Sequence, residues 1–90
     1  MFAITAQKGF HMTFANGNTI SVQWGKGNYC NNYNLESKWG DPVPASSNAE
    51  VLAWNAEGKN IALEETDYPD VVARVCADDV ARMITYIASL

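Results

Sequence analysis

Residues 9–32 read GFHMTFANGNTISVQWGKGNYCNN, a patterned β-hairpin that runs into a polar loop rich in glycine and asparagine. In both arms of the hairpin, apolar and polar side chains alternate, which is the pattern of half-buried strands. The apolar positions are Phe10, Met12 and Phe14 in the first arm and Ile20, Val22 and Trp24 in the second. This hairpin predicts the centre of a β-sheet.

The length of the turn can be predicted from the alternation, because residues that face each other across an antiparallel pair lie on the same side of the sheet. A two-residue turn at 16–17 would mix the polar and apolar faces. A three-residue loop at 15–17 sets Met12 opposite Ile20 and keeps one face apolar. Gly17 would then take the left-handed conformation that closes a type I turn with a bulge.

The length and composition indicate one folded domain over residues 1–90. Hydrophobic residues make up 48% of the chain, which excludes disorder, and no apolar run approaches the roughly 20 residues that a membrane helix needs. The N-terminus lacks the pattern of a secretory signal, and Cys30 and Cys76 are the only cysteines. We therefore expect a cytoplasmic protein with reduced thiols and no membrane partner.

The formal net charge of −4 is unevenly distributed along the chain. Residues 1–40 carry three lysines against Glu36, a net charge of +2, whereas residues 41–90 carry nine acids against three basic residues, a net charge of −6. The mildly basic half contains the polar loop.

Further elements complete an α+β fold. Residues 2–7 predict a short strand with Phe2, Ile4 and Ala6 inward. Residues 71–75 fit a strand or an extension of the final helix, and their β-branched side chains favour the strand. The last segment predicts a helix, with Asp78 and Asp79 at its start and an apolar stripe at Val80, Met83, Ile84, Ile87 and Leu90. We expect an antiparallel sheet of four to five strands with this one C-terminal helix packed on it.

A second hairpin is predicted at 50–54 and 60–64, joined by a type I turn from Asn55 to Gly58. Both of its faces are apolar, which indicates a central position under a helix or an interface. One helix covers one face of a small sheet, so Leu52 and Trp54, or else Val51, Ile61 and Leu63, need another cover. We therefore expect a homo-oligomer.

Residues 25–48 show no sustained periodicity, and loops of this length in compact domains are usually functional or disordered. Glycine backbone N–H groups, a lysine, asparagine amides and an aromatic face together suit a nucleotide or another phosphorylated small ligand. The residues predicted to bind it are Trp24, Lys26, Gly27, Asn28, Tyr29, Asn31 and Trp39. The spacing is neither a Walker loop nor a dinucleotide fingerprint, and the alternative is a glycine-rich turn whose polar residues satisfy its own backbone.

Catalytic and metal sites find less support in the sequence. His11 and Cys30 could form a Cys-His pair, but His11 lies on the polar face of its strand and Cys30 begins no helix. One histidine and two isolated cysteines give no metal-ligand spacing, so no metal or cofactor is expected. The acids Glu64, Glu65, Asp67, Asp70, Asp78 and Asp79 fit a solvated face, or a surface that occupies a protein groove built for nucleic acid.

The run TFANGNTISVQWGKGNYC at 13–30, with the helix start ADDVA at 77–81, resembles small accessory proteins of tailed bacteriophages and prophages. The resemblance covers the first third of the chain and the last helix. It implies action against a host defence in the host cytoplasm, by sequestering a nucleotide signal or by covering a host protein. It supplies no catalytic residues.

These observations predict a non-catalytic binding protein that sequesters a nucleotide-like ligand and binds no nucleic acid directly. The alternatives are an acidic inhibitor that occludes a host protein and a small enzyme that uses Cys30 and His11.

Overall fold

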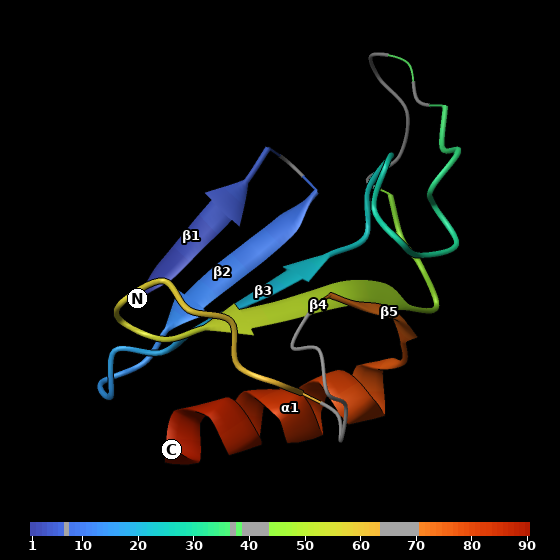
Figure 1. Cartoon of the computed structure of the whole chain (residues 1–90). Helices are drawn as coiled ribbons and strands as arrows, with labels where there is room; N and C mark the ends of the chain where they lie inside the picture. Colours follow the sequence, from blue (N-terminus) through green and yellow to red (C-terminus); the bar gives the residue numbers. More distant parts are fainter. Residues whose placement is uncertain (7, 37, 39–43, 64–70) are drawn as a thin grey trace.

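A computed structural model describes residues 1–6, 8–36, 38, 44–63 and 71–90. These described residues form one five-stranded sheet in the order β1-β2-β3-β4-β5, and a single α-helix follows the last strand (Figure 1). All neighbouring strands are antiparallel, so the predicted α+β class is confirmed. The elements are β1 (Phe2–Thr5), β2 (Gly9–Thr13), β3 (Thr19–Gln23), β4 (Ala49–Trp54), β5 (Val72–Val75) and α1 (Ala77–Ser89).

The β2–β3 hairpin has the predicted register. Met12 lies opposite Ile20 and Phe10 lies opposite Val22. The Phe14 N–H donates to the Asn18 carbonyl at 2.9 Å, and Gly17 has a φ of +86°, so the three-residue loop and its left-handed glycine are confirmed.

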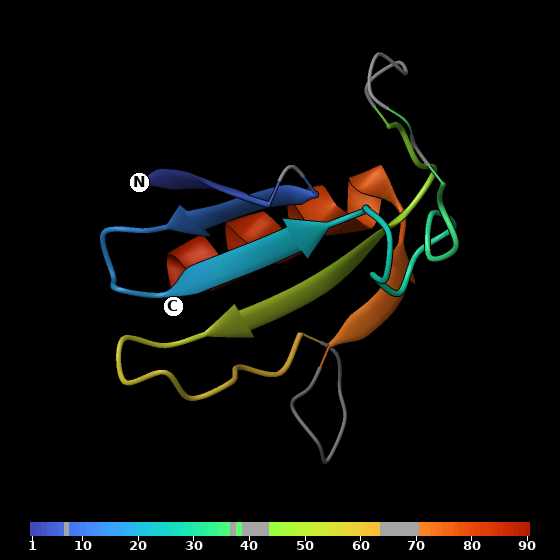
Figure 2. The ribbon, with the colours of Figure 1, turned by 90° about the horizontal axis from the view of Figure 1, so that it is seen from above.

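Helix α1 packs mainly on β3 and β4 and covers one side of the sheet (Figures 1 and 2). Ile87 is its fully buried residue, and Val80, Met83 and Ile84 of the same stripe are partly buried. The buried hydrophobic residues beneath the helix are Ile20, Val22, Ala49, Val51, Ala53 and Val75. Leu90 follows the helix and is exposed, so its predicted place in the stripe is wrong.

Residues 72–75 form the edge strand β5, and the preference for a strand at this position is confirmed. Among its described residues, 60–63, the second arm of the predicted second hairpin does not form a strand. A Trp54–Asn60 bridge and a 2.9 Å bond from Ile61 N–H to the Ala53 carbonyl join this described part of the arm to β4. The reason is that β5 pairs with the same edge of β4, at Ala49 and Val51, and so takes the positions that a longer second arm would need.

The first strand is also shorter than expected, and its apolar side chains are not buried. Phe2 and Ile4 are 76% and 84% exposed, and Ala6 is exposed as well. Phe2 lies opposite Met12 and Ile4 lies opposite Phe10, so the predicted side of the sheet is correct. The prediction of an inward position fails because α1 is centred two strands away, on β3 and β4.

Candidate functional site

The loop after β3 folds back on itself through hydrogen bonds among its own groups. Gly27 N–H donates to the Tyr33 carbonyl at 2.9 Å, and Gly25 N–H donates to Asn28 Oδ1 at 3.0 Å. Cys30 N–H donates to the Asn28 carbonyl at 2.8 Å. These N–H groups are therefore not directed at a ligand, in contrast to the predicted anion-binding arrangement.

A carboxylate from β4 occupies the position that an anion could take on this loop. Glu50 accepts a 2.7 Å hydrogen bond from Tyr29 N–H and a 3.5 Å bond from the Asn28 side chain. The loop is thus fixed to the central sheet by an internal anion, and an external anion would have to be held by side chains.

The asparagines join the loop to the segment 44–48. Asn31 N–H donates to Asn48 Oδ1, and the Asn31 side chain donates to the Ser47 hydroxyl, both at 2.8 Å. Asn32 Nδ2 bridges the carbonyl oxygens of Trp24 and Ala45 at 2.9 and 3.0 Å. The two ends of the long connection are therefore held together beside the end of β3 (Figure 1).

An apolar hollow of about 390 Å³ lies where these segments meet the helix. Its apolar lining comes from β3, β4, β5 and α1, and its polar groups come from the segment 44–48. The residues that line it are Val22, Trp24, Pro44, Ala45, Ser46, Ser47, Asn48, Ala49, Val75, Ala77 and Val80. Trp24 also packs edge-on against Phe10, with ring centroids 6.1 Å apart, and its indole N–H approaches the Pro44 carbonyl at 3.4 Å.

Two tyrosine rings form an exposed stack on the outer side of the loop. Tyr29 and Tyr33 are parallel, with ring centroids 6.0 Å apart and an interplanar angle of 3°, and both are about half exposed. Lys26 is exposed in the same loop. Lys8 packs over Gly25, where an added Cβ would lie 2.6 Å from Lys8 Cγ. Nothing in the sequence pointed to Lys8 at this site, because only the pairing of β2 with β3 places the turn that contains Lys8 beside this loop.

The predicted binding residues therefore separate into two groups. Trp24 lines the hollow, whereas Lys26, Gly27, Asn28, Tyr29 and Asn31 do not. Asn28 and Asn31 hold the loop in place, while Lys26 and Tyr29 present exposed groups. Trp39 and the acids Glu64, Glu65, Asp67 and Asp70 lie outside the described residues.

His11 and Cys30 make separate contacts. The imidazole of His11 packs edge-on against Trp54 with ring centroids 5.1 Å apart. Cys30 is fully buried, and its thiol approaches the Gly25 carbonyl at 3.9 Å. No hydrogen bond joins His11 and Cys30 in the described part of the chain.

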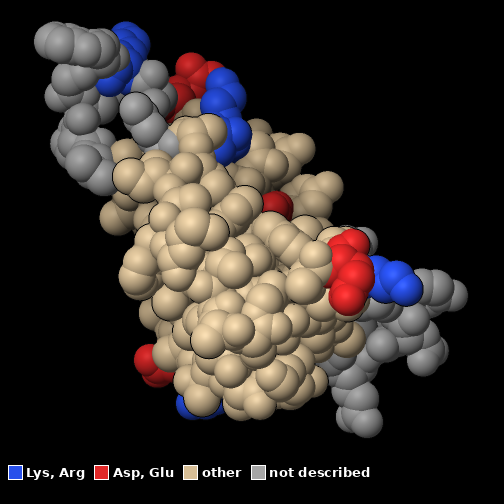
Figure 3. Space-filling model, turned by 90° about the vertical axis from the view of Figure 1, so that its left-hand side faces the viewer, with Lys and Arg blue, Asp and Glu red and all other residues tan. Residues whose placement is uncertain are grey.

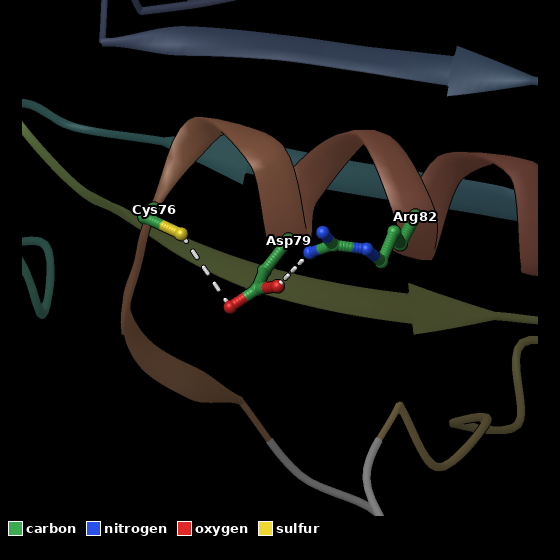
Figure 4. Close-up of polar contacts among 3 residues, drawn as sticks. All are labelled: Cys76, Asp79 and Arg82. Carbon is green, nitrogen blue, oxygen red and sulfur yellow. Dashed lines mark hydrogen bonds and ion pairs between the residues drawn. The ribbon is translucent and has the colours of Figure 1, made fainter.

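Cys76, Asp79 and Arg82 form an exposed cluster at the start of α1 (Figure 4). Cys76 is the N-cap residue, and its thiol lies 3.4 Å from one carboxylate oxygen of Asp79. The other oxygen of Asp79 pairs with the Arg82 guanidinium. Exposed pairs of this kind contribute at most about 1 kcal/mol. No group of three His, Cys, Asp or Glu residues suited to a metal ion occurs among the described positions.

No family model, curated protein or solved structure matches this chain. Within the described ranges, no helix has the length and apolar character needed to cross a bilayer.

Proposed function

We propose that this protein is a non-catalytic binding protein and that the hollow beside Trp24 holds the ring of a nucleotide-like ligand. The supporting observation is the hollow itself. Its volume lies within the range of small-molecule sites, and it combines an apolar lining with a few polar groups from Ser46, Ser47 and Asn48. The indole of Trp24 offers an aromatic surface at which a planar ring gains contact area.

The anionic end of such a ligand would meet lysine ammonium groups, because the loop N–H groups are already bonded within the protein. Lys26 is exposed two residues after Trp24. A lysine acts on a phosphate as a point charge and needs no backbone nest. In the setting that the sequence resemblance implies, sequestration of a nucleotide signal in the host cytoplasm would counteract a host defence.

A thermal-shift panel of mononucleotides, dinucleotides and cyclic nucleotides tests this proposal. A ligand that binds only the native state, present at a concentration about 100 times its Kd, stabilises that state by about 2.7 kcal/mol. In a domain of this size, that corresponds to a rise in Tm of about 10 °C or more. The absence of a shift across the whole panel would contradict the proposal.

Matched variants locate the site. Ala77 lines the hollow at the start of α1, so Ala77→Phe should fill the hollow and abolish the shift. Ala81→Phe, one turn later on an exposed position that does not line the hollow, should leave the shift unchanged. Lys26→Ala should reduce the shift for phosphorylated ligands and leave it unchanged for nucleosides.

A further inference from the structure

Strand β1 is an open edge of the sheet. Met1 and Thr13 exchange both backbone hydrogen bonds, at 2.7 and 2.8 Å, and therefore form a hydrogen-bonded pair with β2. Such pairs alternate along an antiparallel ladder, so Ala3 and Thr5 also direct their backbone groups toward β2. The N–H and C=O groups of Phe2 and Ile4 consequently point outward, where no described strand lies.

The side chains of Phe2 and Ile4 continue the apolar face of the sheet beyond the helix. They lie opposite Met12 and Phe10, which pack against the core, yet they are 76% and 84% exposed. Met1, which lies opposite Thr13 and therefore on the other side of the sheet, is also 83% exposed. Exposed apolar side chains next to each other, such as Phe2 and Ile4, often mark an interaction site.

This side of the molecule carries few charges. Residues 1–25 contain one charged side chain, Lys8, which lies in the turn after β1, and the N-terminal ammonium of Met1, which donates to the Thr13 carbonyl. Figure 3 views the molecule from the left-hand side of Figure 1, where the N-terminus lies, and most of the surface in view is uncharged, with a few charged groups set among it and near its edges. Along Phe2–Thr5, a partner for this edge needs an apolar strand and no compensating side-chain charge.

The opposite edge of the sheet is blocked. The pairing of β4 with β5 contains a register shift, and Arg74 in β5 is exposed with a φ of +53°. The Arg74 N–H donates to the Tyr29 carbonyl at 3.0 Å. Bulges, charged residues and covering loops are the usual protection of edge strands, and within the described residues β1 has none of them along Phe2–Thr5.

We propose that β1 pairs with β1 of a second copy of this chain in an antiparallel, two-fold arrangement. Ala3 would face Ala3 of the second copy, and Phe2 would exchange both backbone hydrogen bonds with the second copy's Ile4. This register uses every outward group of Phe2 and Ile4, and it places the two side chains next to each other on the apolar face. The pairing is self-complementary, which is why a second copy fits this edge better than an unrelated chain does.

Two paired strands of four residues form a small interface beside the approximately 800 Å² per partner of a standard one, so the dimer should be reversible. The proposal concerns assembly and does not depend on the ligand proposed above.

Sedimentation velocity of the full chain across a concentration series tests the dimer. Ile4→Pro removes the outward N–H but no bond to β2, and Ile4→Lys keeps the backbone while placing a charge in the apolar face. Each should raise the dimer Kd about 100-fold or more, because the loss occurs twice in a two-fold interface. Tyr86→Lys, which adds the same charge at a 47% exposed site on α1, should leave Kd unchanged.

Amide hydrogen exchange by NMR gives a direct readout of the register. Exchange at Phe2 and Ile4 should slow as the protein concentration rises, while exchange at Ala3, whose N–H points toward β2, should not change. A wild-type chain that remains monomeric at high micromolar concentration would overturn the proposal. A dimer that tolerates both Ile4 variants would overturn it as well.

Discussion

Gly9 is the residue at which adjacent strands leave no room for a side chain. It lies in β2 between Thr5 of β1 and Gln23 of β3. A Cβ at Gly9 would lie 1.9 Å from the carbonyl oxygen of Val22, a backbone atom that cannot rotate away. Gly9→Ala should therefore lower the free energy of unfolding by about 3 kcal/mol or more, measured by urea denaturation.

The matched control at this scale is Gly58→Ala. An added Cβ there meets nothing within 4 Å, and the remaining cost is the left-handed φ of +81°, about 1 kcal/mol. Equal losses for the two variants would show that strand spacing is not the cause of the Gly9 effect.

At the scale of elements, the β2–β3 turn caps the C-terminus of α1. Asn16 Nδ2 donates to the carbonyl oxygens of Ile87 and Leu90 at 2.9 and 2.8 Å, while its Oδ1 accepts the Asn18 N–H at 3.0 Å. The last turn of the helix has no basic residue to serve this purpose. The asparagine that forms the turn therefore also fixes the helix to the hairpin.

Asn16→Asp separates these two roles, because a carboxylate keeps the turn acceptor and loses the amide donor. It also places a negative charge at the negative end of the helix dipole. We expect a loss of about 2 kcal/mol in unfolding free energy, larger than for Asn16→Ala and partly relieved by salt. Asn34→Asp adds the same charge at an exposed loop position as a control. If Asn16→Asp and Asn34→Asp unfold alike, the cap is not responsible.

At the scale of the whole molecule, the two sides of the sheet have different covers. On the side away from α1, Thr19 and Ser21 are buried, although α1, the helix of the described residues, lies on the other side of the sheet. His11 pairs with Ser21, Trp54 pairs with Thr19, and the rings of His11 and Trp54 meet across β3. Two side chains from neighbouring strands therefore cover the polar residues of the central strand.

This arrangement assigns Trp54 a role within one chain. Trp54→Ala should lower the unfolding free energy by about 2 kcal/mol, less than for a fully buried tryptophan because Trp54 is half-buried. Association should not change, because the proposed dimer uses β1. A variant of unchanged stability that no longer associates in sedimentation experiments would instead place Trp54 in the interface.

The sequence predicted the features that depend on neighbouring residues. Alternation and parity placed Met12 opposite Ile20 and required the left-handed Gly17, and helical spacing located α1. The exposure of Ile4 was not predictable in this way. Alternation shows which residues share a side of the sheet, whereas the position of the helix decides which of them are covered.

Only the tertiary structure showed the hollow of the candidate site and the extent of β4 pairing. The hollow joins Trp24, Ser47 and Val80 from distant parts of the chain, and no local pattern reports that meeting. Asn31 has the polar amide typical of a ligand contact, yet it makes its hydrogen bonds to the 44–48 segment. Polar side chains can satisfy a ligand or their own loop equally well, and only the position of the acceptors distinguishes the two.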